Sequence, residues 1–168
     1  MQGPPFFTDQ DEKRLLYELS KMSNPNHLRL TKLALTTGFR RSELLSLTWS
    51  NIDLKKRTIY IYRKNCAAKD NASVMRLVPL PEKAEKILEE SNERNGKVIE
   101  LSKGAARNGF DKARKRAGLQ TLRFHDLRHI AISRMWSSGM NALEISACSG
   151  HRNIKMLMRY SHYELSLL

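Results

Sequence analysis

The 168-residue chain is predicted to fold as one mainly α-helical domain that carries a small antiparallel β-hairpin, an α+β fold class. Two observations support this prediction. Apolar residues recur at helical spacing over most of the chain, between capping residues and terminating glycines. One region, residues 57–80, is instead rich in β-branched residues on either side of a polar stretch. With 40% hydrophobic residues, a chain of this length can bury a sizeable core.

Three helices are expected before the hairpin. A threonine followed by acidic residues predicts a capped helix over about 8–21. A proline in the first turn predicts a second helix over 25–35, which Gly38 ends. The stretch RRSELLSLTW (40–49) then predicts a third helix.

The hairpin and the later helices follow from local signals of the same kind. RTIYIY (57–62) and VMRLVPL (74–80) are the two expected strands, joined by a long polar tip. A proline at 81 suits the first turn of a helix over 81–92. Caps and terminating glycines then predict helices over 102–118, 125–138, 141–149 and from 153 onward.

The charge of the chain is high and uneven. There are 30 Lys and Arg against 17 Asp and Glu, a net charge of +13. Residues 103–128 hold eight of these bases and only two acids. A strongly basic surface favours a polyanionic partner, above all nucleic acid, and Lys112 and Arg116 are candidate DNA contacts in this segment. A solvated basic face that keeps the protein soluble is the alternative.

Signals for export or membrane insertion are missing from the sequence. The apolar runs are too short for a transmembrane helix, and the N-terminal segment lacks the apolar region of a secretory signal. Cys66 and Cys148 show no metal-binding spacing and suit a reducing compartment. We therefore expect a cytoplasmic protein with no membrane partner.

Residues 125–129 read HDLRH, two histidines four apart with an acid after the first, as in a zinc protease helix. On a helix both histidines share a face, but Arg128 lies beside that face, and a permanent cation opposes metal binding. The sequence also offers no third ligand at a familiar spacing. His125 and Arg128 together suit a phosphate, because a guanidinium fork binds two oxygens and an imidazole transfers protons near neutral pH. Two ordinary structural histidines are the alternative.

Other motifs accompany this one in a fixed order. TGFRRSELLSLTW carries an arginine just after a helix-ending glycine, a lysine ends the first predicted strand, and SGHRNIKMLMRY places a histidine nine residues before a tyrosine. This order resembles the catalytic domain of the tyrosine recombinases, also called the phage-integrase family, over about residues 8–162. The local sequences FHDLRHIAISR and SGHRNIKMLMRYSH look closest to those of shufflon-type invertases and phage integrases.

The resemblance implies an enzyme, a site-specific recombinase that cuts and rejoins double-stranded DNA through a covalent 3′-phosphotyrosine. It implies a catalytic set made of Arg40, Lys64, His125, Arg128, His151 and Tyr160. A phenol with a pKa of about 10 is a poor nucleophile near neutral pH, so Tyr160 needs assistance. Arg40 and Arg128 would hold the non-bridging oxygens and stabilise the charge that develops on them.

The other members of the set would handle protons and the phosphate. The resemblance implies that His125 assists proton transfer at the phenol and that His151 hydrogen-bonds the same phosphate. Lys64 would protonate the departing 5′ oxygen in place of a metal ion, so neither a metal nor another cofactor is expected. Lys69 competes with Lys64 for this role, because it stands nearer to the RLVPL stretch of the second strand.

Several neighbours of these residues receive other interpretations. Glu43 is expected to orient the start of its helix, His129 to pack against or support the site, and Trp136 to lie in the core. Arg41 and Arg152 are candidate DNA-backbone contacts or plain surface residues.

Two other functions stay open on the sequence alone. One is a type IB topoisomerase that only relaxes supercoils, and the other is a DNA-binding module without catalysis. Sequence-specific joining of two duplexes tests the first, and a covalent DNA adduct tests the second. The resemblance further implies self-association on DNA as a tetrameric synapse. It implies a single catalytic domain over 1–168, without the N-terminal DNA-clamping domain of the family.

Overall fold

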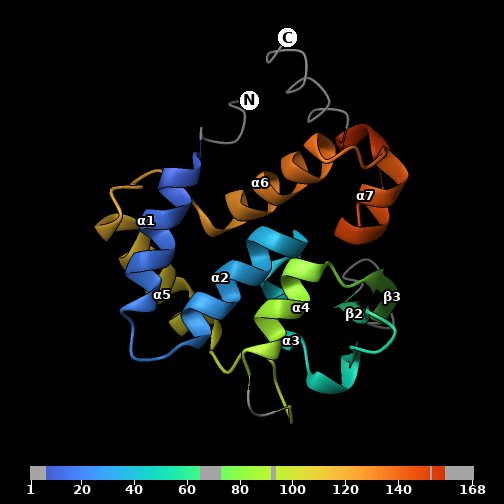
Figure 1. The fold of residues 1–168 in the computed structure, drawn as a ribbon, viewed down its shortest axis with the longest axis horizontal. Helices are drawn as coiled ribbons and strands as arrows, with labels where there is room; N and C mark the ends of the chain where they lie inside the picture. The colour runs from blue at the N-terminus through green and yellow to red at the C-terminus, as the bar shows by residue number, and fades with distance from the viewer. Residues whose placement is uncertain (1–6, 65–72, 92–93, 152, 158–168) are drawn as a thin grey trace.

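The computed structural model describes residues 7–64, 73–91, 94–151 and 153–157 (Figure 1). The chain is mainly helical, as predicted, and its strands form one small sheet. In chain order the elements are α1 (Asp9–Ser20), α2 (Asn26–Thr37), α3 (Arg41–Ser46), η1 (Trp49–Asn51), β1 (Ile52–Asp53), β2 (Thr58–Lys64), β3 (Ser73–Pro79), α4 (Glu82–Glu89), α5 (Lys103–Arg116), α6 (Phe124–Ser137), α7 (Ala142–Ser149) and η2 (Ile154–Met156).

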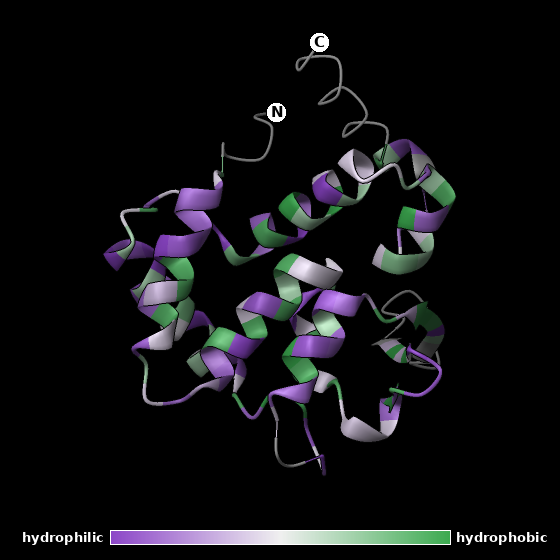
Figure 2. Ribbon diagram, viewed as in Figure 1, coloured by the Kyte–Doolittle hydropathy of each residue, from purple (hydrophilic) through white to green (hydrophobic). Residues whose placement is uncertain are grey.

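Helix α2 lies at the centre of the helical part and contacts α1, α3, α4, α5 and α6. Its side chains Leu30 and Leu33 are each 1% exposed. Hydrophobic and hydrophilic residues both occur along α2 and α6 (Figure 2). Because a truncated core leucine leaves a cavity, Leu33→Ala should cost about 2–5 kcal/mol of unfolding free energy.

Helix α6 packs on α2, and α7 turns back from the end of α6 toward the sheet, where it contacts β3 (Figure 1). Asn141 caps α7, since its side chain accepts from the N–H groups of Leu143 and Glu144. This arrangement brings the end of α7 close to the sheet and to the start of α6. Among the described residues, no helix is both long and apolar enough to cross a membrane.

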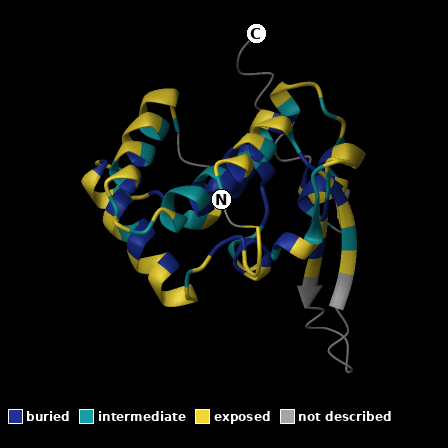
Figure 3. Cartoon of the chain, turned by 60° about the horizontal axis from the view of Figure 1, so that its bottom comes forward, coloured by how far each residue is buried: buried dark blue, intermediate teal, exposed yellow. Residues whose placement is uncertain are grey.

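The predicted hairpin is confirmed and gains a third strand. The order is β1-β2-β3, with both pairs antiparallel. Ile59 and its partner Val78 are each 1% exposed, whereas the next pair, Tyr60 and Leu77, is 38% and 54% exposed. The two faces of the sheet therefore differ sharply in burial, and the hairpin stands at one side of the domain (Figure 3). The sequence missed β1 because a two-residue strand is too short for an alternating pattern.

The third predicted helix is shorter than expected. The pattern predicted it over 40–49, but α3 ends at Ser46. The backbone after it pairs with residues 96–98 instead: Val98 N–H donates to the Leu47 carbonyl, and Trp49 N–H donates to the Gly96 carbonyl. A tertiary pairing that the local sequence does not reveal thus ends the helix. The helix expected from 153 onward begins as the short η2, and residues after 157 lie outside the described part.

Candidate active site

The turn between α2 and α3 places Arg40 at the start of a helix. Gly38 ends α2 in the left-handed conformation (φ 65°), which favours glycine. The Arg40 N–H donates to Glu43 Oε2 at 2.9 Å, and the Arg40 guanidinium donates to Glu43 Oε1 at 3.2 Å. The Arg40 side chain is 27% exposed. Glu43 therefore orients the start of α3, as the sequence predicted.

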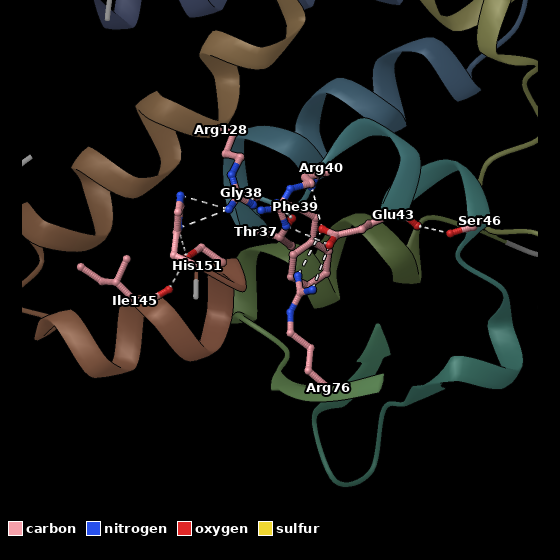
Figure 4. Close-up of polar contacts among 11 residues, drawn as sticks. Thr37, Gly38, Phe39, Arg40, Glu43, Ser46, Arg76, Arg128, Ile145 and His151 are labelled. Atoms are coloured by element: carbon pink, nitrogen blue, oxygen red, sulfur yellow. Dashed lines mark hydrogen bonds and ion pairs between the residues drawn. The ribbon is translucent and has the colours of Figure 1, made fainter. Parts of the chain in front are cut away.

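Glu43 is 3% exposed and has a second cation beside it. Arg76 of β3 donates to both carboxylate oxygens, at 2.9 and 3.2 Å (Figure 4). Burial alone would raise the pKa of Glu43, but the hydrogen bonds and charges of Arg76 and Arg40 lower it below its ordinary value. The carboxylate thus stays ionised between two guanidinium groups.

The first turn of α6 carries the HDLRH motif and explains its acid. Asp126 accepts from the Arg123 N–H at 2.7 Å and binds the Arg123 guanidinium, and it is 1% exposed. Asp126 is therefore the capping acid of α6 rather than a general base. The rings of His125 and His129 meet edge to face, with centroids 5.0 Å apart. Within the described ranges, no group of three or more His, Cys, Asp or Glu residues could hold a metal ion.

Arg128 connects three parts of the chain. Its side chain comes from α6 and is buried, at 3% exposed. Nη1 donates to the Gly38 carbonyl at 2.6 Å, two residues before Arg40, and Nη2 lies 3.2 Å from Nδ1 of His151 (Figure 4). These contacts bridge 90 and 23 residues of sequence. Three predicted site residues, Arg40, Arg128 and His151, are thereby brought together.

The end of α7 fixes His151. Gly150 ends the helix in the left-handed conformation (φ 70°), so the next residue turns back toward the site. The Ser149 Oγ lies 2.7 Å from His151 Nδ1, and the Ser146 hydroxyl donates to the His151 carbonyl at 2.6 Å. Side-chain and backbone contacts together restrain the position of the imidazole.

The surroundings of His125 favour its neutral form. Partial burial lowers its pKa, and the charge of Arg128 lowers it further, while Asp126 opposes both effects. The imidazole is therefore neutral near pH 7. A neutral imidazole can accept a proton from a neighbouring acid.

A pocket of about 430 Å³ opens between the start of α3, α5 and the start of α6. It is lined by Phe39, Arg41, Arg107, Phe110, Asp111, Arg114, Arg123, Phe124, His125 and Arg128. Its lining holds five arginines and one carboxylate, and the Arg41 guanidinium lies over the Phe124 ring, 5.8 Å from its centroid. The pocket is thus strongly cationic and continuous with His125 and Arg128.

Arg107 and Arg114 are pocket cations that sequence reasoning missed. At about 100° per residue, they lie roughly 140–180° around α5 from Lys112 and Arg116, the predicted DNA contacts, which are exposed. The sequence signal that could have identified them is their spacing, which places both arginines beside the apolar face of α5.

Several predicted site residues are not placed. The backbone of Lys64 ends β2, but its side chain is outside the described part of the structure. Lys69, Arg152 and Tyr160 lie outside the described residues altogether. Trp136 is partly buried against the core, close to its expected place.

The described residues thus form a mainly α domain in which arginine and histidine side chains cluster beside a cationic pocket. The chain matches the Phage integrase family over residues 5–165 and belongs to that family. It is 35% identical over 161 residues to a shufflon-specific DNA recombinase of Escherichia coli, covering 92% of this chain and 39% of the relative. It is 28% identical to the integrase of Salmonella phage P22, covering 79% of this chain and 38% of that protein.

Solved structures share the fold. The catalytic domain of bacteriophage HP1 integrase is 27% identical, with a TM-score of 0.75, and the match covers 94% of this chain and 87% of that one. XerA recombinase is 21% identical, with a TM-score of 0.72, over 96% of this chain and 60% of the other. The chain therefore has the tyrosine-recombinase catalytic-domain fold, while it spans about two fifths of the length of the curated relatives named above.

Proposed function

We propose that this chain is the catalytic domain of a site-specific recombinase that cuts and rejoins double-stranded DNA. The observation that carries the proposal is the position of Arg128, whose guanidinium contacts both the turn before Arg40 and the His151 ring. Residues far apart in sequence thereby converge beside a cationic pocket. A transferred phosphoryl group develops charge on its non-bridging oxygens, and such a cluster stabilises that charge.

The proposed cleavage step breaks one bond and forms another. The Tyr160 hydroxyl attacks the scissile phosphorus and gives up its proton with the help of His125, which the lowered pKa keeps in its neutral form. The bond from phosphorus to the 5′ oxygen breaks, and Lys64 protonates that oxygen. The products are a 3′-phosphotyrosine and a free 5′ hydroxyl, and rejoining is the reverse step.

Arg40, Arg128 and His151 would hold the same phosphate. In this scheme the side chains supply the charge that metal ions supply in other strand-cutting enzymes, so no cofactor is required. Cleavage should therefore persist in excess EDTA. Activity that vanishes with the chelator and returns with Mg²⁺ or Zn²⁺ would contradict this part of the proposal.

Double-stranded DNA is the proposed partner. The net charge of +13 and the cationic pocket support it. Arg41 and Arg152 are proposed backbone contacts, and Lys112 and Arg116 are the alternative contacts on the other flank of α5. XerH recombinase, which shares the fold with a TM-score of 0.70 at 18% identity over 99% of this chain and 52% of that one, was solved bound to its difH substrate. Self-association on DNA as a tetrameric synapse and a cytoplasmic location complete the proposal.

The decisive experiment is covalent capture. The chain is incubated with a library of nicked duplexes of randomised sequence, and DNA that stays bound through SDS is recovered and sequenced. We expect an adduct that maps to Tyr160, whereas Tyr160→Phe binds DNA but forms none. An adduct that persists in Tyr160→Phe, or one that maps to Tyr163, would show that the nucleophile is another residue.

The choice between Lys64 and Lys69 needs its own test. A 5′-bridging phosphorothiolate at the scissile position leaves without needing a proton. Lys64→Ala should cleave normal DNA slowly and recover strongly on the sulfur substrate, while Lys69→Ala should be near normal on both. The reverse pattern would assign the general acid to Lys69.

A further inference from the structure

Arg76 is a charged residue at an inward-facing position of the sheet. The register pairs it with Ile61, which is 1% exposed, and the neighbouring inward pair is Ile59 with Val78. Only 17% of the Arg76 side chain is exposed. Arginine is seldom buried unless it is paired, so the position requires a specific partner.

One side of the Arg76 guanidinium holds the carboxylate that orients Arg40. Nη1 donates to Glu43 Oε1 at 2.9 Å, and this oxygen also accepts from the Arg40 guanidinium at 3.2 Å. Nη2 donates to Glu43 Oε2 at 3.2 Å. Because Arg76 binds both oxygens, its loss would let Glu43 draw the Arg40 guanidinium toward itself.

The other side of Arg76 touches the residue before His151. A Cβ built on Gly150 would lie 2.8 Å from the Arg76 Cζ and 2.8 Å from Nη1, closer than real Cβ atoms approach. The guanidinium thus fills the space beside Gly150. It also lies over the Phe39 ring, 5.5 Å from the centroid, on the turn that carries Arg40 (Figure 4).

We propose that Arg76 is a positioning residue that sets Arg40 and His151 relative to each other on the substrate phosphate. This inference rests on the proposed function. The planar fork matters, because it binds the two oxygens of Glu43 while one face packs on Phe39. A lysine supplies the charge but neither the fork nor the plane.

The test measures single-turnover cleavage at saturating protein, on the nicked duplex recovered by covalent capture. Arg76→Met and Arg76→Lys are compared with Arg134→Met, a matched control that breaks an arginine ion pair to Glu12. Since misplacement by about 1 Å can cost roughly 100-fold, we expect Arg76→Met to cleave about 100-fold more slowly. Arg76→Lys should be intermediate, and Arg134→Met close to wild type.

A second substrate separates positioning from general structural damage. In a scissile methylphosphonate a methyl group replaces one non-bridging oxygen, so less charge develops for the arginines to stabilise. The defect of Arg76→Met should shrink on this substrate, as should that of Arg40→Ala. A defect caused by damage to the fold would be equal on both substrates, and that result would overturn the role of Arg76.

The remaining outcomes are equally decisive. If Arg76→Met does not fold, Arg76→Lys keeps the charge beside Glu43 and must show the same shrinking defect. Wild-type cleavage with full activity in both variants would overturn the inference and leave the proposed function intact. No cleavage by the wild-type chain would overturn both.

Discussion

Helices α3 and α6 begin with the same capping arrangement, but the two capping arginines differ in their exposure. In each, an arginine at the N-cap binds an acid three residues later through its N–H and its guanidinium: Arg40 with Glu43, and Arg123 with Asp126. Both acids are buried, at 3% and 1% exposed. Yet the Arg123 side chain is 77% exposed, against 27% for Arg40.

The difference lies in what surrounds each pair. Glu43 has Arg76 beside it, while Asp126 is held by an arginine that reaches into solvent. The capping motif alone therefore does not distinguish the proposed catalytic arginine, Arg40, from Arg123. A second cation on the acid, and neighbours such as Arg128, set Arg40 apart from Arg123.

The largest expected effect is the difference between the two capping arginines in the rate of DNA cleavage. Removing a group that stabilises developing charge slows a reaction by about 10²–10³-fold, so Arg40→Ala should lose that much in single-turnover cleavage. Arg123→Ala should cleave close to wild type at saturating protein. Equal losses in the two variants would mean that both arginines contact the phosphate.

Substitutions of the two acids should lower the unfolding free energy of the protein by different amounts. Glu43→Ala leaves Arg76 buried without its carboxylate, and breaking a buried ion pair from one side costs about 3–5 kcal/mol. Asp126→Ala frees an arginine that is already exposed, so the loss is chiefly that of a cap, about 0.5–2 kcal/mol. Denaturant unfolding of both variants at neutral pH measures the contrast.

The pH dependence of the Glu43 variant provides a control. The folded pKa of Glu43 lies below its ordinary value, so its stabilising contribution is present above that ordinary value. It is lost as the pH falls through the folded pKa. The stability difference between wild type and Glu43→Gln should therefore shrink under acid conditions, and a constant difference would exclude ionic stabilisation.

This pair of helices also shows what the sequence could and could not predict. The start of α3 followed from a local signal, the glycine that ends α2, and the place of Glu43 there was predicted correctly. For the helix over 125–138 the local signal was Gly139 at its end, and the capping of its start by Asp126 was not predicted. Arg76 was missed, although strand alternation puts it on the face of Ile59 and Val78, where a charge is unusual. What the sequence could not supply was the partner, because Glu43 lies 33 residues away on another element.

The predicted end of α3 was wrong for the same reason, because a partner distant in the sequence decides it. Helical spacing continued through 49, and only the pairing of Leu47 and Trp49 with residues 96–98 stops the helix at Ser46. The convergence of Arg40, Arg128 and His151 was implied by the family resemblance rather than by any spacing. The contacts of Arg128 supply its physical basis.

We expect DNA to contact α5 on the flank that lines the pocket beside α6. Each phosphate neutralised contributes roughly 0.9 to the slope of log K against log salt. Arg107→Gln, on the pocket flank, should reduce that slope by about this amount and weaken binding to all sequences alike. Lys112→Gln is the matched change on the other flank, and a smaller effect is expected there. A larger effect from Lys112 would place the DNA on the flank that the sequence predicted.

The smallest effect concerns His125, which stands next to the capping acid of α6. Its pKa is lowered by partial burial first and by Arg128 second, so its proton NMR titration should have a midpoint below the ordinary value of about 6.5. Arg128→Met should raise the midpoint without restoring it fully, because burial remains.

Since the folded state resists protonation of the His125 imidazole, the protein should lose stability when the pH falls through about 6.5. His125→Gln should remove that loss and identify the resonance. A midpoint at or above about 6.5 in the free protein would mean that the negative charge of Asp126, which raises the pKa of His125, outweighs burial and Arg128. A midpoint above about 7 would further mean that His125 is mostly protonated at neutral pH and unsuited to accept the tyrosine proton.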